Sequence, residues 1–172
     1  IIKGGKKTFY AVSNGFAEIE NDTVTVLTDS AEEATAIDLA RRNAQALGVA
    51  DRVTFVETDV LAGVDGTFDL IASNPPYVPD IDRPALQPEV VEYEPGNALF
   101  GGADGLDVVR RVVHDAVTSL APSGWLLVEF GLGQADQMTQ LISATPGLTM
   151  VALKRDLQGI PRVVVARSGP AV

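Results

Sequence analysis

Apolar positions recur along this chain with two different periods. Apolar side chains that repeat every three or four positions predict helices at about residues 30–47, 104–121 and 134–142. Short apolar runs bounded by turn residues indicate buried strands at residues 52–57, 68–73 and 125–130. Because these strands alternate with helices, the pattern predicts βαβ units and a mostly parallel sheet.

The two ends of the chain depart from this alternation. Residues 1–28 predict a β-meander, with strands at 8–12, 16–20 and 23–28 and a hairpin signal at Asn14-Gly15. Near the other end, runs at 148–155 and 161–167 predict two strands joined by a short turn, and therefore an antiparallel hairpin. We expect an α/β, Rossmann-like layered sandwich that forms a single domain over residues 1–172, with a meander at 1–28 and a body at 29–172.

Composition narrows the classes of function. The chain has 172 residues and no run near the roughly 20 apolar residues of a membrane helix, and no signal peptide is evident. We therefore expect a cytoplasmic protein with no membrane partner. It has no cysteine and one histidine, which argues against thiolate and histidine-rich metal sites, so we expect no metal. A net charge of −10 disfavours broad binding to a phosphate backbone, so no direct nucleic-acid partner is expected.

Polar residues stand at the ends of three predicted strands. They are Asp29, Asp59 and Asn74. The carboxyl ends of parallel strands share one edge of a sheet, where α/β folds bind ligands, and a carboxylate there can accept hydrogen bonds from a ribose. Two simpler interpretations remain open, because Asp29 also fits a helix N-cap and Asp59 a turn residue.

Two further features favour structural interpretations. Gly131-Leu132-Gly133 follows a predicted strand, but so short a glycine pattern favours a strand-to-helix turn over a cofactor loop. The single histidine, His114, lies with Arg110, Arg111 and Asp115 on the polar face of its predicted helix. That position favours an exposed surface histidine over a catalytic one.

The stretch Asn74-Pro75-Pro76-Tyr77 carries the most specific chemistry in the sequence. Consecutive prolines end the preceding strand and stiffen the loop. The Asn74 side-chain oxygen and the Pro75 carbonyl could accept the hydrogens of an amide, localise its nitrogen lone pair and aim that nitrogen at an electrophilic methyl group. Tyr77 could wall such a site. Catalysis would then rest mainly on orientation, with no general base in the first step.

From about residue 24 onward, the sequence resembles the catalytic domain of the HemK/PrmC family, S-adenosylmethionine-dependent enzymes that methylate a glutamine side-chain nitrogen in peptide-chain release factors. The resemblance rests on the stretches Ala40-Arg41-Arg42-Asn43-Ala44, Asp51-Arg52-Val53-Thr54-Phe55, Asn74-Pro75-Pro76-Tyr77-Val78, Glu92-Tyr93-Glu94-Pro95, Ala98 to Gly102, Asp104-Gly105-Leu106-Asp107, Gly124 to Glu129, Asp156-Leu157 and Arg162-Val163-Val164.

This resemblance implies roles for individual residues. Asn74 and Pro75 would hold the glutamine amide, with Pro76 and Tyr77 completing the catalytic loop. Asp29 would take the ribose hydroxyls of S-adenosylmethionine, Asp59 would lie near its adenine, and Asn74 would also border the cofactor. The implied fold is a class I methyltransferase sandwich, and the implied partner is a release factor with a glutamine-containing loop.

The beginning of the chain departs from that family. It lacks the glycine-rich loop that ends the family's first strand, and residues 1 to about 40 instead resemble the epsilon subunit of F-type ATP synthases. The resemblance rests on Phe9-Tyr10-Ala11-Val12, Gly15 to Ile19, Val24 to Leu27 and Ala31-Glu32-Glu33-Ala34 to Ile37-Asp38. We interpret the chain as a composite, or chimera, in which an N-terminal β-meander replaces the usual first strand and glycine loop.

Replacement of the usual first strand and glycine loop has consequences for fold and function. An empty centre would leave two rows of unpaired backbone groups, so we expect an N-terminal strand, foremost residues 8–12, to fill the missing slot. Without the glycine loop, binding of S-adenosylmethionine should be weak or lost. Two alternatives to an impaired glutamine methyltransferase follow: a non-catalytic protein that keeps the fold, and an epsilon-type stalk subunit.

Overall fold

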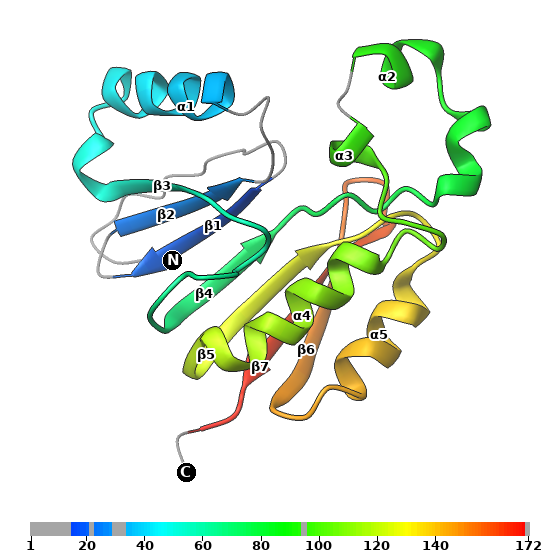
Figure 1. Cartoon of the computed structure of the whole chain (residues 1–172). Coiled ribbons are helices and arrows are strands. Elements are labelled where there is room, and N and C mark those ends of the chain that lie inside the picture. The colour runs from blue at the N-terminus through cyan, green and yellow to red at the C-terminus, as the bar shows by residue number, and fades with distance from the viewer. Residues whose placement is uncertain (1–14, 21–22, 29–33, 94–95, 171–172) are drawn as a thin grey trace.

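The computed structural model describes residues 15–20, 23–28, 34–93 and 96–170. Its centre is a seven-stranded sheet with the strand order β3-β2-β1-β4-β5-β7-β6 (Figure 1). The strands are β1 (Gly15–Glu20), β2 (Thr23–Thr28), β3 (Val53–Glu57), β4 (Phe68–Ser73), β5 (Leu120–Glu129), β6 (Leu148–Arg155) and β7 (Pro161–Ser168). The longer helices are α1 (Ala34–Ala46), α4 (Asp107–Ser119) and α5 (Ala135–Ser143).

Strand directions define one functional edge of the sheet. β2 is parallel to β3, and β4 is parallel to β5. β1 is antiparallel to both β2 and β4, so these two neighbours run in the same direction. β7 is antiparallel to both β5 and β6. The carboxyl ends of β2 to β6 therefore lie at one edge, which we call the carboxyl edge, and the predicted antiparallel hairpin is confirmed.

The central slot of the sheet is held by β1, where Phe16 stands opposite Ser73 and Ala17 opposite Val26. The predicted strands at 16–20 and 23–28 are confirmed, while residues 8–12 lie outside the described part of the chain. The expectation that residues 8–12 fill the slot between β2 and β4 is wrong. The two-residue connection from β1 to β2 allows only an antiparallel hairpin, which brings the nearest strand in sequence into that position.

The helices cover the sheet in two groups. α1 connects β2 to β3 and α4 connects β4 to β5, but the two connections step in opposite directions along the strand order. Because parallel crossovers are right-handed, these helices cover opposite faces of the sheet. Figure 1 shows α1 beside β2 and β3, and α4 and α5 along β5 to β7. α4 buries Val109, Val112, Val113 and Ala116 completely or almost completely in the core.

Residues 78–103 form short helices despite their several prolines. They form a 3-10 helix, η3 (Asp80–Ala85), followed by α2 (Pro88–Tyr93) and α3 (Gly96–Leu99). A bridge between Val78 and Phe100 then closes the segment back onto its own start. The segment is therefore an excursion whose two ends are joined beside the carboxyl edge.

Element boundaries elsewhere lie close to the predicted ones. α1 ends before Gly48, which has a positive φ of 66°. α4 begins at Asp107, three residues later than predicted, and β5 begins at Leu120. Residues 121–124 are thus part of β5, where Ser123 has a φ of 64°. No helix in the described ranges is long and apolar enough to span a membrane.

Candidate active site

The loop Asn74 to Tyr77 leaves the carboxyl end of β4 at the centre of the carboxyl edge. Ser73, the last residue of β4, stands opposite Phe16 of β1 and Val128 of β5. Asn74 is therefore level with the start of β1 and with Glu129 at the end of β5. Its side chain is exposed, whereas that of Pro75 is buried. The Asn74 amide is thus exposed at the carboxyl edge, on a loop held in place by the buried Pro75.

Main-chain pairing holds the exit of this loop. The Val78 N–H donates to the Leu99 carbonyl at 2.9 Å, and the Gly101 N–H donates to the Val78 carbonyl at 3.0 Å. One step further, the Asp80 N–H donates to the Gly102 carbonyl at 2.9 Å. These hydrogen bonds join the two ends of the excursion directly beside the loop.

The chain returns from the excursion at residues 100–105, which we call the returning segment. Glycines allow this segment to pack against the main-chain carbonyls of Pro76 and Tyr77. A Cβ atom on Gly101 would lie 2.5 Å from the Pro76 carbonyl oxygen, and one on Gly105 would overlap with the Tyr77 carbonyl. Gly105 also has a φ of 77°, in the region that favours glycine. The sequence showed these glycines only as part of a family resemblance, and the structure supplies the physical reason for them.

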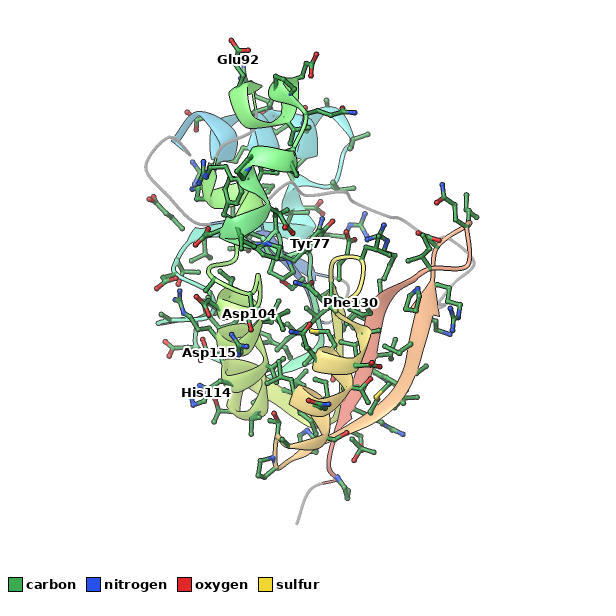
Figure 2. The ribbon with its side chains drawn as sticks, turned by 90° about the vertical axis from the view of Figure 1, so that its right-hand side faces the viewer. Tyr77, Glu92, Asp104, His114, Asp115 and Phe130 are labelled. Carbon is green, nitrogen blue, oxygen red and sulfur yellow. The ribbon has the colours of Figure 1, made fainter. Side chains whose placement is uncertain are left out.

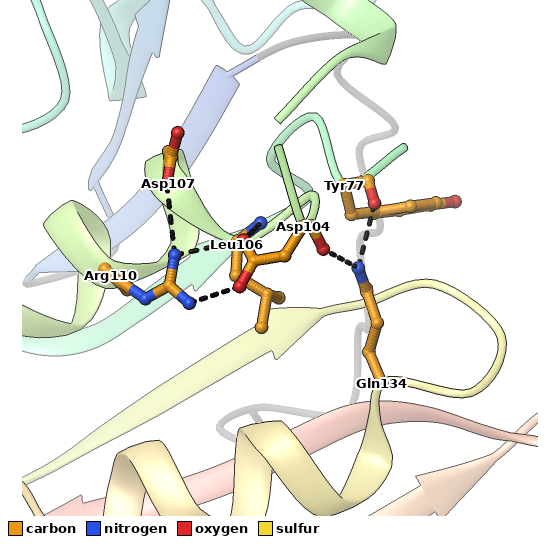
Figure 3. Close-up of polar contacts among 6 residues, drawn as sticks. All are labelled: Tyr77, Asp104, Leu106, Asp107, Arg110 and Gln134. Atoms are coloured by element: carbon orange, nitrogen blue, oxygen red, sulfur yellow. Dashed lines mark hydrogen bonds and ion pairs between the residues drawn. The ribbon is translucent and has the colours of Figure 1, made fainter. Parts of the chain in front are cut away.

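Gln134 joins three segments that are distant in sequence. Its side-chain oxygen accepts the Gly131 N–H at 2.7 Å, and its Nε2 donates to the Tyr77 carbonyl at 3.0 Å and the Asp104 carbonyl at 3.2 Å (Figure 3). Only 6% of Gln134 is exposed. Sequence reasoning missed this residue, because a glutamine before a helix gives no signal of its partners. The Gly131-Leu132-Gly133 stretch leads into this helix and is confirmed as a strand-to-helix turn.

The Tyr77 ring is fixed at its other end by Glu129. The Tyr77 hydroxyl donates to Glu129 Oε1 at 3.1 Å. Burial and the neighbouring Glu129 carboxylate raise the pKa of Tyr77 above its ordinary value of 10.0, although Arg162 opposes the shift. Tyr77 is therefore neutral at physiological pH and acts as a hydrogen-bond donor. Figure 2 shows Tyr77 lying above Phe130, which follows β5.

An acidic cluster around Arg110 supports the Gly105 turn. Arg110 binds Asp104 at 2.5 Å and Asp107 at 3.0 Å, and Asp104 also accepts the Leu106 N–H at 3.1 Å. The hydrogen bond from Arg110 is the main cause that lowers the pKa of Asp104. These contacts tie the start of α4 to the segment whose carbonyl Gln134 binds (Figure 3).

The other predicted site residues lie apart from this network. Asp29 is outside the described residues. Asp59 lies just beyond β3, is exposed, and forms an ion pair with Arg111 of α4. His114 is 88% exposed at its side chain and contacts Asp115, as expected of a surface histidine. Among the described residues, no group of acidic and histidine side chains is arranged to hold a metal ion.

Curated relatives match most of the chain. The chain is 47% identical over 135 residues to the release factor glutamine methyltransferase of Bradyrhizobium diazoefficiens, which covers 78% of this chain and 46% of the relative. It is 50% identical over 135 residues to the enzyme of that name from Geobacter sulfurreducens, with the same coverage of both chains. Most of the chain is homologous to release factor glutamine methyltransferases. It spans about half the length of the relatives it matches.

Solved structures agree on the fold. A methyltransferase from Pyrococcus furiosus matches with a TM-score of 0.58 at 17% identity, covering 84% of this chain and 62% of that one. TrmN from Thermus thermophilus matches with a TM-score of 0.54 at 16% identity, covering 83% and 36%. The predicted Rossmann-like class I methyltransferase fold is confirmed.

The N-terminal segment has a different similarity. Residues 1–34 match the family model of the ATP synthase Delta/Epsilon chain, β-sandwich domain. This supports the resemblance to the epsilon subunit inferred from the sequence. β1 and β2 both fall inside the matched range, so a segment similar to a β-sandwich domain supplies two strands of a methyltransferase sheet.

Proposed function

We propose that this chain is a catalytic region of an S-adenosylmethionine-dependent methyltransferase that acts on a glutamine side-chain nitrogen in a peptide-chain release factor. The observation that carries the proposal is the exposed Asn74 amide, held on the buried Pro75 at the carboxyl edge. The named activity of homologues at 47–50% identity supports the choice of substrate.

The proposed chemistry depends on orientation of the acceptor amide. The Asn74 side-chain oxygen and the Pro75 carbonyl accept the two hydrogens of the glutamine amide, which draws the nitrogen lone pair out of conjugation. S-adenosylmethionine supplies an electrophilic methyl group when bound. The amide nitrogen would then take that methyl group, the electrons of the broken carbon–sulfur bond would stay on sulfur, and the nitrogen would lose one proton to solvent.

The loop around Asn74 fits this task because its position is set by several independent contacts. The Gln134 amide holds the Tyr77 carbonyl, Glu129 holds the Tyr77 hydroxyl, and Val78 is paired with the returning segment. A rigid acceptor site contributes to rate by removing orientational freedom before the reaction. Tyr77 then supplies a neutral aromatic wall beside the acceptor.

The cofactor side of the proposed site is less complete. In the proposal, Asp29 binds the ribose and Asp59 lies near the adenine, although Asp59 would have to leave or share its ion pair with Arg111. β1 is antiparallel to β4, so its carboxyl end, Glu20, points away from the carboxyl edge. A glycine loop following β1 cannot then reach the methionine part of the cofactor. We therefore propose weak binding of S-adenosylmethionine.

Mass spectrometry tests the proposed function. A release factor is incubated with the chain and methyl-labelled S-adenosylmethionine, and its peptides are searched for a labelled glutamine. We expect slow labelling of one glutamine, abolished by Asn74→Ala and unchanged by His114→Ala, which alters an exposed side chain. Absence of labelling at high concentrations of chain and cofactor would favour the alternative, a non-catalytic protein that keeps the fold.

The stalk-subunit alternative has narrower support. It rests on residues 1–34, and β3 to β7 lie outside that match. In the described part of the chain, β1 and β2 pair with β4 and β3 of the methyltransferase-like sheet. Their strand pairing is thus used within the present fold.

A further inference from the structure

An open groove of about 660 Å³ begins at Tyr77 and runs between two segments. One wall comes from η3, with Ile81, Asp82 and Leu86, and another from the turn into α5, with Leu132 and Gln137. Tyr77 and Gln134 also line the groove, and Figure 3 shows the hydrogen bond between them. The groove is thus built on the same network that fixes the proposed acceptor loop.

Two large apolar side chains that line this groove are exposed to solvent. Ile81 is 81% exposed and Leu132 is 72% exposed. Single exposed apolar residues are ordinary, whereas apolar side chains that gather along one groove are typical of ligand-binding grooves. A ligand that covers an exposed leucine or isoleucine should bind about tenfold more tightly for each side chain it fully buries.

The charge of the groove is acidic. Asp104 lines it but is already bound to Arg110. Asp82 also lines it and is exposed. The neighbouring cation, Arg83, is directed to the Phe100 ring, with 3.7 Å from the guanidinium carbon to the ring centroid. With a chain charge of −10, this surface favours a ligand that carries a basic group near an apolar one.

We propose that the groove binds the extended polypeptide next to the acceptor glutamine, with an apolar side chain against Ile81 and Leu132 and a basic side chain beside Asp82. This rests on the proposed function, because Tyr77 belongs to both the acceptor loop and the groove. Continuity between the two makes a polypeptide that enters the loop the natural occupant. The groove then selects the sequence around the glutamine, while Asn74 and Pro75 hold the amide.

Photo-crosslinking locates the peptide. A synthetic peptide spanning the release-factor glutamine, with a benzophenone side chain beside it, is irradiated with the wild-type chain without cofactor. We expect crosslinks within residues 79–86 or 131–137. Crosslinks that map only to other parts of the chain would overturn the proposal, and so would failure of the peptide to bind a wild-type chain that methylates the intact release factor.

Fluorescence anisotropy with matched variants tests the apolar contact. Leu132→Glu should weaken binding of a fluorescent form of the peptide about tenfold, the factor expected for losing one buried leucine. Leu47→Glu is the control, because Leu47 is similarly exposed at 66% but follows α1, at the opposite edge of the sheet. Equal affinity for the two variants would contradict the proposal.

A charge swap tests the role of Asp82 and separates this inference from the proposed function. Asp82→Lys should weaken binding of a peptide with a basic residue beside the glutamine and strengthen binding of the same peptide with glutamate there. Both measurements need neither cofactor nor methyl transfer. Peptide binding that depends on the groove but occurs without methylation would support the peptide site and contradict the proposed activity. Methylation that is unaffected by Leu132→Glu and Asp82→Lys would support the activity and contradict the peptide site.

Discussion

The side-chain amide of Gln134 donates a hydrogen bond of 3.0 Å to the main-chain carbonyl of Tyr77, 57 residues earlier in the chain. The same amide group reaches the Asp104 carbonyl, and its oxygen accepts the Gly131 N–H. One buried side chain therefore connects the loop at residues 74–77, the segment before α4 and the turn into α5. This loop is part of the core's hydrogen-bonding network, although Asn74 itself is exposed.

Gln134→Leu should lower the stability of the fold and make the loop at residues 74–77 more mobile. The substitution keeps the volume but leaves the buried Gly131 N–H without its partner, which costs roughly 1–3 kcal/mol. Urea unfolding should show a lower midpoint, and hydrogen exchange should show faster exchange at the Val78 N–H. Gln140→Leu, at an exposed position of α5, is the control, and equal midpoints for the two variants would refute the assignment.

Gly105→Ala should disturb the loop more than a positive φ alone explains. Gly105 and Gly133 have φ values of 77° and 86°, but a Cβ on Gly133 meets nothing within 4 Å. Gly133→Ala should therefore cost only the backbone strain, on the order of 1–3 kcal/mol. At Gly105 the added Cβ overlaps with the Tyr77 carbonyl, so denaturant unfolding should give a larger loss. A smaller loss at Gly105 would show that the returning segment moves freely.

Tyr77 should make stability depend on pH in the alkaline range. Its pKa is raised above 10.0 in the folded chain, chiefly by burial and then by Glu129. The folded state thus holds a proton that the unfolded state has lost. The stabilising contribution is complete below pH 10.0 and is lost as the pH rises through the folded-state pKa.

Tyr77→Phe removes this ionisation and keeps the ring. The decline of unfolding free energy above pH 10.0 should be shallower in the variant than in the wild type. Ultraviolet difference titration of the two proteins would isolate the Tyr77 ionisation from that of the other two tyrosines. A Tyr77 component that titrates at or below the ordinary value would contradict the hydrogen bond to Glu129.

S-adenosylmethionine should bind this chain weakly. The physical reason is the antiparallel direction of β1, whose carboxyl end lies away from the edge where the cofactor would sit. Isothermal titration calorimetry should therefore detect only low affinity, and S-adenosylhomocysteine should behave in the same way. Binding in the low-micromolar range would show that other residues replace the missing glycine loop.

The end of β4 and the rigidity of the loop that follows it could be predicted from local sequence. Pro75 and Pro76 can end a strand in any context, because their φ is fixed and they lack an N–H donor. The apolar run before Asn74 is long enough to be a buried strand, and the structure ends β4 at Ser73. The same local logic predicted the C-terminal hairpin of β6 and β7.

Contacts between distant segments could not be predicted in this way. Gln134 and Gly105 meet Tyr77 only because α4, the returning segment and the turn into α5 converge at the carboxyl edge. Likewise, an acid that follows a strand was expected to serve a cofactor, but Asp59 lies within reach of Arg111 of α4. Side-chain partners depend on packing, which sequence spacing along one strand does not encode.

The sequence by itself determined the elements, the rigid Asn-Pro-Pro-Tyr loop and the two family resemblances, since each depends on residues close together in the chain. Tertiary structure decided which strand fills the centre of the sheet. Residues 16–20 and 23–28 could be recognised as strands, but their slot depended on unpaired edges of β3 and β4 that form elsewhere. A short turn fixed β1 antiparallel to β2, and pairing with β4 then placed its start, instead of its end, beside Asn74.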